Sequence, residues 1–268
     1  MAWTLLRAII VAYLLIIALL WIFQRRFIYF PSTGGAQQLE TAARHLALQP
    51  WNLADGTRAG WASGGTGRAW IIFHGNAGFA LDRAPFVALI RAVDANAAVF
   101  LFEYPGYGAR PGPPSETAIA SAAIAAAEDL SASRGGAVHL VGESIGTSFA
   151  AAVAGRLGDR APALLLITPF NRMADVAAHH YPLMPVRWLL RERHDAARAL
   201  AHYRGRAAIL VAENDLVVPR KFGEALHDAL TCDKRLWLIP RAGHNGIPYH
   251  PAAPWWREAV SYCSGGDR

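Results

Sequence analysis

Cysteine is scarce in this chain. Its 268 residues include two cysteines, Cys232 and Cys263. Two thiols are too few for a disulfide framework, and they leave open either one bridge in an oxidising compartment or two free thiols. The sequence therefore excludes the small disulfide-rich scaffolds, and the fold must depend on a hydrophobic core.

Lysine is equally scarce, since Lys221 and Lys234 are the two lysines, and arginine carries almost all of the formal net charge of +6. The arginines are spread along the chain among acidic residues, without a recognisable nucleic-acid-binding motif. No cysteine, histidine and carboxylate residues recur at metal-site spacing, and His179-His180, which lacks such partners, is expected at the surface. We therefore expect no metal, no cofactor and no nucleic-acid partner, and we leave the oligomeric state open.

Charge is nearly absent from one long stretch near the N-terminus. Residues 2–23 contain a single charged side chain, Arg7, and Arg25-Arg26 follow. Such a stretch can cross a hydrocarbon layer of about 30 Å. It lacks the small-x-small cleavage site of a signal peptide and the polar stripe of a core helix. We expect residues 1–30 to be a retained, single-pass membrane anchor. Basic residues flank both ends, so the sequence leaves the side of the membrane open.

After the anchor, short apolar runs alternate with helical segments. Asp55-Gly56 predicts a hairpin within residues 45–62, and residues 116–132 read as a helix with Ser115 as N-cap. This alternation predicts one α/β domain over residues 31–268, with a parallel sheet covered by helices on both faces. The six apolar runs are residues 69–73, 97–102, 137–141, 163–167, 207–211 and 235–239.

Residues 170–203 interrupt the alternation with two prolines and a cluster of large apolar residues. We expect this segment to be an inserted cap. Beside a membrane tether, an apolar cap favours a lipid-like or fatty-acyl substrate over a sugar or a nucleotide. The apolar residues of the cap are Tyr181, Leu183, Met184, Trp188, Leu189 and Leu190.

One segment has the pattern of a nucleophile elbow. Gly142-Glu143-Ser144-Ile145-Gly146 stands between a predicted strand and a predicted helix. In such a turn the central residue is held in a strained backbone conformation, and the glycines let the helix pack against the strand. We predict that Ser144 is a nucleophile.

An acid and a histidine follow Ser144 in the order that an acyl-transfer triad of this kind requires. Asp215 comes after the run at 207–211, and His244 comes after the run at 235–239. Glu213 is the nearest rival acid, but Asp215 stands further along its loop, where its carboxylate can reach an imidazole. Since parallel-sheet sites form at the carboxyl ends of strands, the three side chains can converge.

The loop His74-Gly75-Asn76-Ala77-Gly78 follows the first central run and supplies a candidate oxyanion hole. Acyl transfer places negative charge on the former carbonyl oxygen, which backbone N–H groups can stabilise. We expect the two donors to be the N–H groups of Asn76 and of Ile145, the residue after the nucleophile.

Taken together, these motifs resemble a membrane-anchored branch of the α/β-hydrolase superfamily. The branch combines an N-terminal apolar helix with, in order, HGNAG, a Y-x-G-[YF]-G segment, G-x-S-[IL]-G, D-x-x-[VI]-P and a final GH. This chain has them at residues 74–78, 104–108, 142–146, 215–219 and 243–244, and departs from many relatives at Thr147, where they have a second glycine. The resemblance implies the α/β-hydrolase fold with a mostly parallel, eight-stranded sheet and a serine-esterase mechanism.

The sequence thus predicts a serine hydrolase that cleaves a carboxylic ester or thioester. Two alternatives remain open. One is a membrane-tethered binding module of the same fold without catalysis, and the other is a peptidase-like amide hydrolase. The resemblance does not carry a substrate, because relatives act on lipids, acyl-proteins and peptides.

Overall fold

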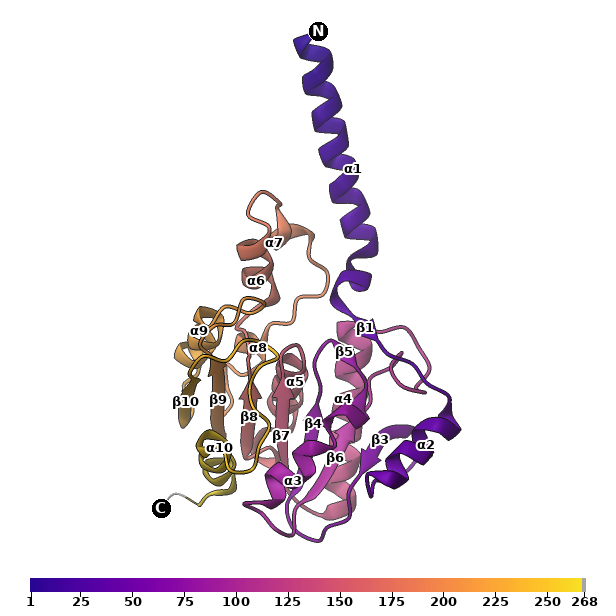
Figure 1. Ribbon diagram of the computed structural model, residues 1–268, viewed down its shortest axis with the longest axis vertical. Coiled ribbons are helices and arrows are strands. Elements are labelled where there is room, and N and C mark those ends of the chain that lie inside the picture. The colour runs from indigo at the N-terminus through magenta and orange to yellow at the C-terminus, as the bar shows by residue number, and fades with distance from the viewer. Residues whose placement is uncertain (267–268) are drawn as a thin grey trace.

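An eight-stranded sheet forms the centre of the structure, a computed structural model that describes residues 1–266 (Figure 1). The strand order is β10-β9-β8-β7-β4-β6-β3-β2, and every pair is parallel except β2 with β3 and β3 with β6. The strands are β2 (Gln49–Asn52), β3 (Arg58–Ala62), β4 (Ala69–Phe73), β6 (Ala98–Phe102), β7 (Val138–Glu143), β8 (Ala163–Ile167), β9 (Arg206–Ala212) and β10 (Lys234–Ile239).

The fold predicted from the sequence is confirmed, and each of the six apolar runs is a strand with bounds close to those expected. The central strands are buried on both faces, which is why their sequences are almost continuously apolar. On β4, Ile71 and Phe73 face one core while Trp70 and Ile72 face the other.

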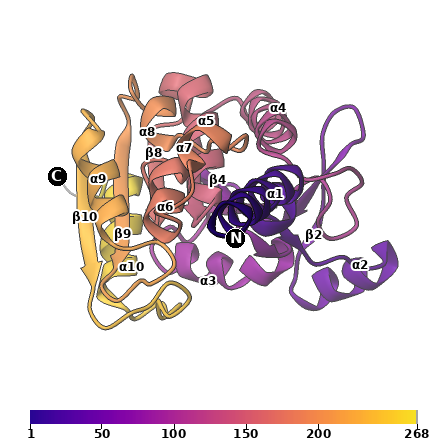
Figure 2. The same ribbon diagram turned by 90° about the horizontal axis from the view of Figure 1, so that it is seen from above.

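Helices cover both faces of the sheet (Figure 2). One face carries α4 (Glu116–Arg134), α5 (Gly146–Leu157), α8 (Ala196–Ala199) and α9 (Lys221–Ala229). The other carries α2 (Ala36–His45), α3 (Pro85–Arg91) and α10 (Pro254–Ser264). Ser115 caps α4 as expected, since its Oγ accepts the N–H of Ala118 at 3.1 Å. Cys232 and Cys263 are both free thiols.

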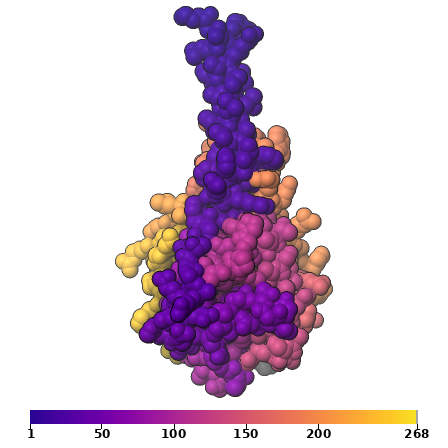
Figure 3. Space-filling view, turned by 90° about the vertical axis from the view of Figure 1, so that its right-hand side faces the viewer, coloured from indigo at the N-terminus to yellow at the C-terminus, as the bar shows by residue number. Residues whose placement is uncertain are grey.

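The N-terminal helix α1 (Ala2–Ile28) projects from the sheet domain and stands clear of it over its upper part (Figures 1 and 3). Its most apolar 18-residue window has a mean hydropathy of 2.7, and none of that window is buried in the protein. By length and composition, α1 can cross a membrane. At its base, the short strand β1 (Phe30–Pro31) pairs in parallel with β5 (Ala77–Gly78), the last part of the predicted oxyanion loop.

The inserted segment predicted as a cap contains α6 (Met173–His180) and α7 (Val186–Leu189), and it rises beside α1 (Figure 1). The hydroxyl of Tyr13, in the first half of α1, donates a hydrogen bond of 2.6 Å to the carbonyl oxygen of Leu183. The apolar helix and the inserted segment are therefore in direct contact far from the sheet.

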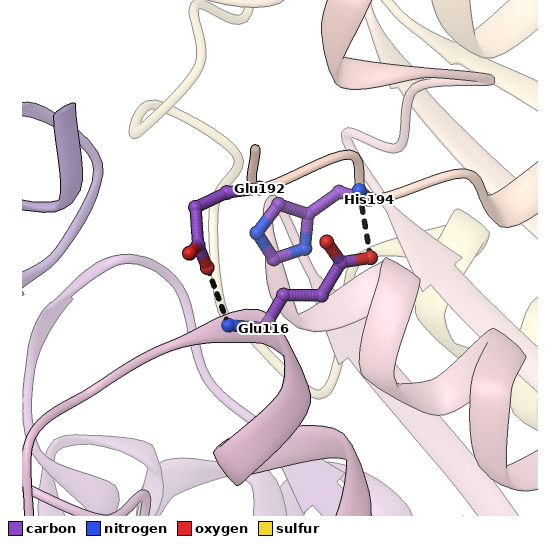
Figure 4. A group of neighbouring side chains, drawn as sticks. All are labelled: Glu116, Glu192 and His194. Carbon is purple, nitrogen blue, oxygen red and sulfur yellow. Dashed lines mark hydrogen bonds between the residues drawn. The ribbon is translucent and has the colours of Figure 1, made fainter. Parts of the chain in front are cut away.

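A group of polar side chains, buried at its centre and exposed at Arg25, joins α1 to the inserted segment and to α4. The Glu192 carboxylate accepts hydrogen bonds from the Arg25 Nε and the Tyr29 hydroxyl, each at 2.7 Å, and from the backbone N–H of Glu116. Figure 4 shows Glu192 and Glu116 on either side of His194. We call this group the junction cluster, and its members are Arg25, Tyr29, Glu116, Glu192 and His194.

His194 extends the junction cluster to α5, the helix that follows Ser144. Its Nδ1 lies 2.8 Å from the Ser148 Oγ, its Nε2 lies 3.0 Å from the Tyr29 hydroxyl, and its backbone N–H donates to the Glu116 carboxylate at 2.8 Å. His194 is fully buried with a φ of 40°, and burial lowers its pKa to about 4. The imidazole is therefore neutral in the folded protein at neutral pH.

Two glycines allow α5 to pack closely against β7, which places the turn between them. A Cβ on Gly142 would lie 2.6 Å from the Gly146 carbonyl oxygen and 2.6 Å from the Thr147 Cα. A Cβ on Gly146 would collide with the backbone of Phe73 and His74. The requirement for small residues at both positions is confirmed, because a side chain would push the helix off the sheet.

We expect Gly142→Ala to lower the free energy of unfolding by about 1 to 3 kcal/mol, because the methyl group overpacks the contact between β7 and α5. Urea unfolding of the full chain in detergent micelles, followed by circular dichroism, measures this. Gly136→Ala is the matched control, since a Cβ there has nothing nearer than 3.9 Å. Equal stability of the two variants would contradict the close-packing argument.

His194 makes stability depend on pH. Its pKa of about 4 in the folded protein lies below the ordinary 6.5, so between these values the unfolded chain binds a proton that the folded chain does not. Stability should therefore fall as the pH drops from 6.5 to about 4, with His194 contributing on the order of 3 kcal/mol.

His194→Asn replaces the titrating imidazole by a neutral amide, so neither the folded nor the unfolded chain binds a proton there. Asparagine also tolerates the left-handed backbone at that position. Urea titrations at pH 7 and pH 4.5 should show a smaller loss for this variant than for the wild type. His202→Asn, at an exposed site on the same segment, is the control. An undiminished loss in His194→Asn would rule out the buried imidazole as its source.

Candidate active site

Ser144 lies in the turn between β7 and α5, as the sequence predicts. Its φ of 52° is in the left-handed region, which is strained for a residue with a side chain. Its backbone N–H donates to the Ile167 carbonyl oxygen at 2.9 Å, which ties the turn to the end of β8. The close-packed glycines and this hydrogen bond hold the strained conformation, and they present the Ser144 hydroxyl at the carboxyl edge of the sheet.

The structure brings His244 and Asp215 to this serine. The His244 Nε2 lies 2.9 Å from the Ser144 Oγ, and its Nδ1 lies 2.7 Å from the Asp215 Oδ2. Asp215 is buried, and its other carboxylate oxygen accepts the N–H groups of Val217 at 2.9 Å and Val218 at 2.7 Å. Both oxygens of the acid are thus fixed, and one of them is aimed at the imidazole.

Glu213, the rival acid, does not reach the histidine. Its carboxylate accepts the backbone N–H of Arg241 at 2.8 Å, in the turn after β10. Of the two acids on this loop, the structure therefore places Asp215 against His244. Glu213 instead ties the loop after β9 to the loop after β10.

The predicted oxyanion loop lies next to the nucleophile. A Cβ on Gly75 would lie 3.9 Å from the Ser144 Cβ. Within residues 1–266, neither the Asn76 N–H nor the Ile145 N–H has a hydrogen-bond partner. Their two donors remain available for a ligand oxygen, which is what an oxyanion hole requires. The carbonyl oxygen of Asn76 is used differently, since it accepts the Phe30 N–H at 2.9 Å and the Tyr107 hydroxyl at 2.7 Å.

Aromatic packing holds this loop in place. The His74 ring stacks on Tyr104 with centroids 3.8 Å apart, and the Tyr104 hydroxyl donates to the His74 carbonyl oxygen at 2.5 Å. Tyr104 and Tyr107 belong to the segment at residues 104–108. That segment therefore packs against the oxyanion loop and fixes its backbone.

Sequence reasoning missed a second polar network at the site, centred on the buried carboxylate of Glu143. Its carboxylate accepts hydrogen bonds from the Arg83 guanidinium and from the Tyr249 hydroxyl, the latter at 2.7 Å. Although burial opposes it, the attraction of Glu143 raises the pKa of Arg83. The network connects η1 (Ala80–Arg83), the elbow and the loop after His244. The signal was the charged residue directly before the nucleophile, in a strand that is apolar apart from His139.

Two cavities flank different edges of the sheet. One of about 230 Å³ adjoins the site and is lined by residues of the Glu143 network together with Phe86 and Asn245. A larger one of about 620 Å³ is lined by Arg68, His139 and Arg206, at the amino ends of the strands, and by none of the predicted site residues. Of these two cavities, the one at the carboxyl edge is therefore the one that adjoins the predicted site residues.

One group of side chains has the composition of a metal site. Ligand atoms of Glu116, Glu192 and His194 lie within 4.8 Å of one another, and no other such group occurs among residues 1–266. The carboxylates and both ring nitrogens already have hydrogen-bond partners within the chain. These bonds account for the arrangement, and we assign it no metal.

Comparison with known proteins gives relatives in sequence. The chain is 35% identical to the uncharacterized protein Rv2307c of Mycobacterium tuberculosis over 242 residues, which cover 86% of this chain and 83% of that protein. It is 30% identical to the uncharacterized protein YfhR of Escherichia coli K12 over 225 residues, covering 81% of this chain and 76% of that protein.

Comparison with solved structures extends the similarity to the fold. An esterase of Pyrococcus furiosus superposes with a TM-score of 0.65 at 12% identity, covering 89% of this chain and 97% of the esterase. Est1E of Butyrivibrio proteoclasticus, solved with ferulic acid bound, superposes with a TM-score of 0.63 at 17% identity, covering 79% of this chain and 96% of Est1E. At these identities the likeness concerns the fold.

A family model described as the alpha/beta hydrolase fold matches residues 70–196, which run from β4 through the elbow into the inserted segment. Together with the sequence relatives and the superposition on solved structures, this match shows that the chain belongs to the alpha/beta hydrolase fold family.

Proposed function

We propose that this protein is a serine hydrolase that cleaves a carboxylic ester or thioester through an acyl-enzyme on Ser144. The observation that carries the proposal is the continuous series of hydrogen bonds from the buried Asp215 through His244 to the Ser144 hydroxyl, with distances of 2.7 and 2.9 Å. A serine hydroxyl is a weak nucleophile by itself, and an adjacent imidazole that can take its proton activates it.

Acylation begins when the Ser144 Oγ attacks the substrate carbonyl carbon and its proton passes to the His244 Nε2. Asp215 holds the imidazole in the required tautomer and stabilises the imidazolium. The N–H groups of Asn76 and Ile145 stabilise the negative oxygen of the tetrahedral intermediate. The intermediate collapses, the bond to the leaving group breaks, and His244 returns its proton to the departing alcohol or thiol.

Deacylation repeats these steps with water. His244 takes a proton from the water as its oxygen attacks the acyl carbon, and the same two N–H groups hold the oxyanion. When the ester bond to Ser144 breaks, the proton moves from His244 to the Ser144 Oγ. A carboxylic acid leaves, and the free enzyme is restored without any other reactant.

The proposal also assigns residues 1–30 to a membrane anchor and residues 31–268 to a catalytic domain, with residues 170–203 as its cap. Support comes from α1, whose apolar window projects from the domain without being buried in it. The apolar side chains of the cap stand beside this helix, which favours a lipid-like or fatty-acyl substrate. The esterase and Est1E share the fold and set a precedent for ester chemistry on it.

A fluorophosphonate probe tests the nucleophile. We expect the full chain in detergent micelles to be labelled, Ser144→Ala to show no labelling, and His244→Ala to label at least about 10³ times more slowly. Gel fluorescence against time measures these rates, and Ser133→Ala, on an exposed turn of α4, is the matched control. Absence of labelling in folded wild type would favour the binding module instead.

Replacing the acid tests the orienting role of Asp215. Asp215→Asn should lower kcat for p-nitrophenyl butyrate by about 10³ to 10⁴, because an amide donates toward the Nδ1 and favours the wrong tautomer. The comparison variant is Glu213→Gln, whose carboxylate contacts the backbone of Arg241 rather than the imidazole, and its kcat should stay near the wild-type value. A larger loss for Glu213→Gln than for Asp215→Asn would reverse the assignment of the acid.

A further inference from the structure

Large apolar side chains are exposed at the carboxyl edge of the sheet, on the cap and on the loop that carries Asp215. Leu183, Trp188 and Leu216 are 86%, 87% and 84% exposed, more than any other large apolar side chain of the sheet domain and cap. Gathered apolar exposure of this kind marks an interaction surface. We call this surface the apolar rim, and it consists of Tyr181, Leu183, Trp188, Leu216 and Val217.

The two parts of the apolar rim are connected. α6 ends at His180, directly before Tyr181, and the His180 Nε2 lies 2.9 Å from the Val217 carbonyl oxygen. The cap portion of the rim is thereby fixed to the loop of Asp215. Leu216 and Val217 follow Asp215 in sequence, so the rim begins next to the triad.

The cap portion of the rim lies along α1. Tyr13 and Gln24 are the polar residues in the uncharged stretch between Arg7 and Arg25, apart from the indole of Trp21. Both bind cap backbone. Tyr13 donates to the Leu183 carbonyl oxygen, while the Gln24 Nε2 lies 3.5 Å from the Leu189 carbonyl oxygen and its Oε1 accepts the Arg191 N–H at 2.8 Å. With a rise of about 1.5 Å per residue, these contacts extend over about 16 Å of α1.

The hydrogen bonds of Tyr13 and Gln24 to the cap backbone have a physical reason if the cap enters hydrocarbon. Irregular backbone has no water to bind there, so its polar groups need partners from the protein. Tyr13 and Gln24 supply such partners to the irregular backbone of the cap, from a helix whose other side chains in this stretch are apolar.

We propose that the apolar rim docks on the same bilayer that α1 crosses, with Leu183 and Trp188 inserted in its near leaflet, so that Ser144 takes an acyl chain from that leaflet. This inference rests on the proposed function for its substrate and on the proposed anchor for its orientation. The partner of the rim is then a lipid surface. The substrate is an ester whose acyl chain lies among the lipids of that surface.

Basic residues mark the level of the head groups. Arg25 and Arg26 lie in the last turn of α1, and Arg191 lies over the Trp21 ring at 4.6 Å and donates to the Trp21 carbonyl oxygen at 3.1 Å. Tryptophan and arginine at one level of a spanning helix are typical of the membrane interface, and cations there attract anionic lipids. Leu183 lies beyond this level, beside Tyr13, and therefore within the apolar part of the leaflet.

The apolar rim and the base of α1 each connect to a loop of the proposed catalytic site. On one side, the rim continues into the loop of Asp215. On the other, the Phe30 N–H at the base of α1 donates to the carbonyl oxygen of Asn76, the proposed oxyanion residue. In this arrangement the acyl chain reaches Ser144 along the apolar rim, whose residues Leu216 and Val217 directly follow Asp215.

Lipid quenching tests the docking directly. Leu183→Cys in a Cys232→Ser background is labelled with an NBD fluorophore, and the full chain is reconstituted in phosphatidylcholine–phosphatidylglycerol vesicles with or without brominated acyl chains. Ala132→Cys, exposed at the far end of α4, is the matched control. We expect brominated lipid to quench the label at position 183 and to leave the label at position 132 unchanged.

Two results overturn the docking. One is an unquenched label at position 183 in protein that co-floats with the vesicles. The other is a signal that follows the protein-to-lipid ratio and ignores bromination, which assigns the rim to a second copy of the chain.

The substrate part is tested by two rates for the double variant Leu183→Asp/Trp188→Asp, one for a long-chain ester held in vesicles and one for soluble p-nitrophenyl acetate. The ratio of the vesicle rate to the soluble rate should fall by about tenfold or more, because aspartate resists entry into hydrocarbon. Leu46→Asp, at an exposed leucine beside α2, is the control. An unchanged ratio overturns lipid-side substrate entry.

Failure of the proposed function gives a different pattern. Wild type would then hydrolyse neither ester and take no fluorophosphonate label, while the quenching measurement would still decide whether the rim docks on lipid. If the double variant does not fold, the same two rates are measured for the single variant Trp188→Asp, at an 87% exposed position.

Discussion

The left-handed turn at Ser144 is the constraint on which the rest of the site depends. It exists because Gly142 and Gly146 let α5 approach β7 at backbone distance, and because the Ser144 N–H is held by the Ile167 carbonyl oxygen. A relaxed turn would move the hydroxyl away from the imidazole, which lies 2.9 Å from it. A residue in this conformation carries a strain of about 1 to 3 kcal/mol, which the packing around Ser144 offsets.

The parallel sheet then determines where the other residues of the proposed site lie. Its strands end at one edge, so the loops after β4, β7, β9 and β10 supply Asn76, Ser144, Asp215 and His244 from four distant parts of the sequence. β1 pairs with β5 at this same edge, within the oxyanion loop and directly after Asn76. Because β1 is paired at this edge, α1 leaves the domain at the edge of the sheet that carries the proposed catalytic residues, and not at the opposite edge.

Sequence patterns predicted the features that depend on local chemistry. The elbow, the hairpin at Asp55-Gly56, the Ser115 cap and the apolar strands follow from glycine geometry, capping and burial. The junction cluster could not be predicted, because its members, such as Arg25 and Glu192, are 167 positions apart and carry no motif. Glu143 stands in the elbow motif, but its partners Arg83 and Tyr249 come from distant loops and carry no such signal. The same holds for the contact between Tyr13 and Leu183, which depends on how the cap is directed after Phe170.

The junction cluster explains why the cap and α1 have one arrangement. Desolvating Glu192 is costly, and three donors offset that cost, so the cluster contributes modestly to net stability. An apolar contact would be as stable but would let α1 rotate about Tyr29, since apolar packing is not directional. Hydrogen bonds are directional and fix the rotation. If α1 and the apolar rim meet one bilayer, their relative orientation has to be fixed, and a buried polar junction at the base of the helix achieves this.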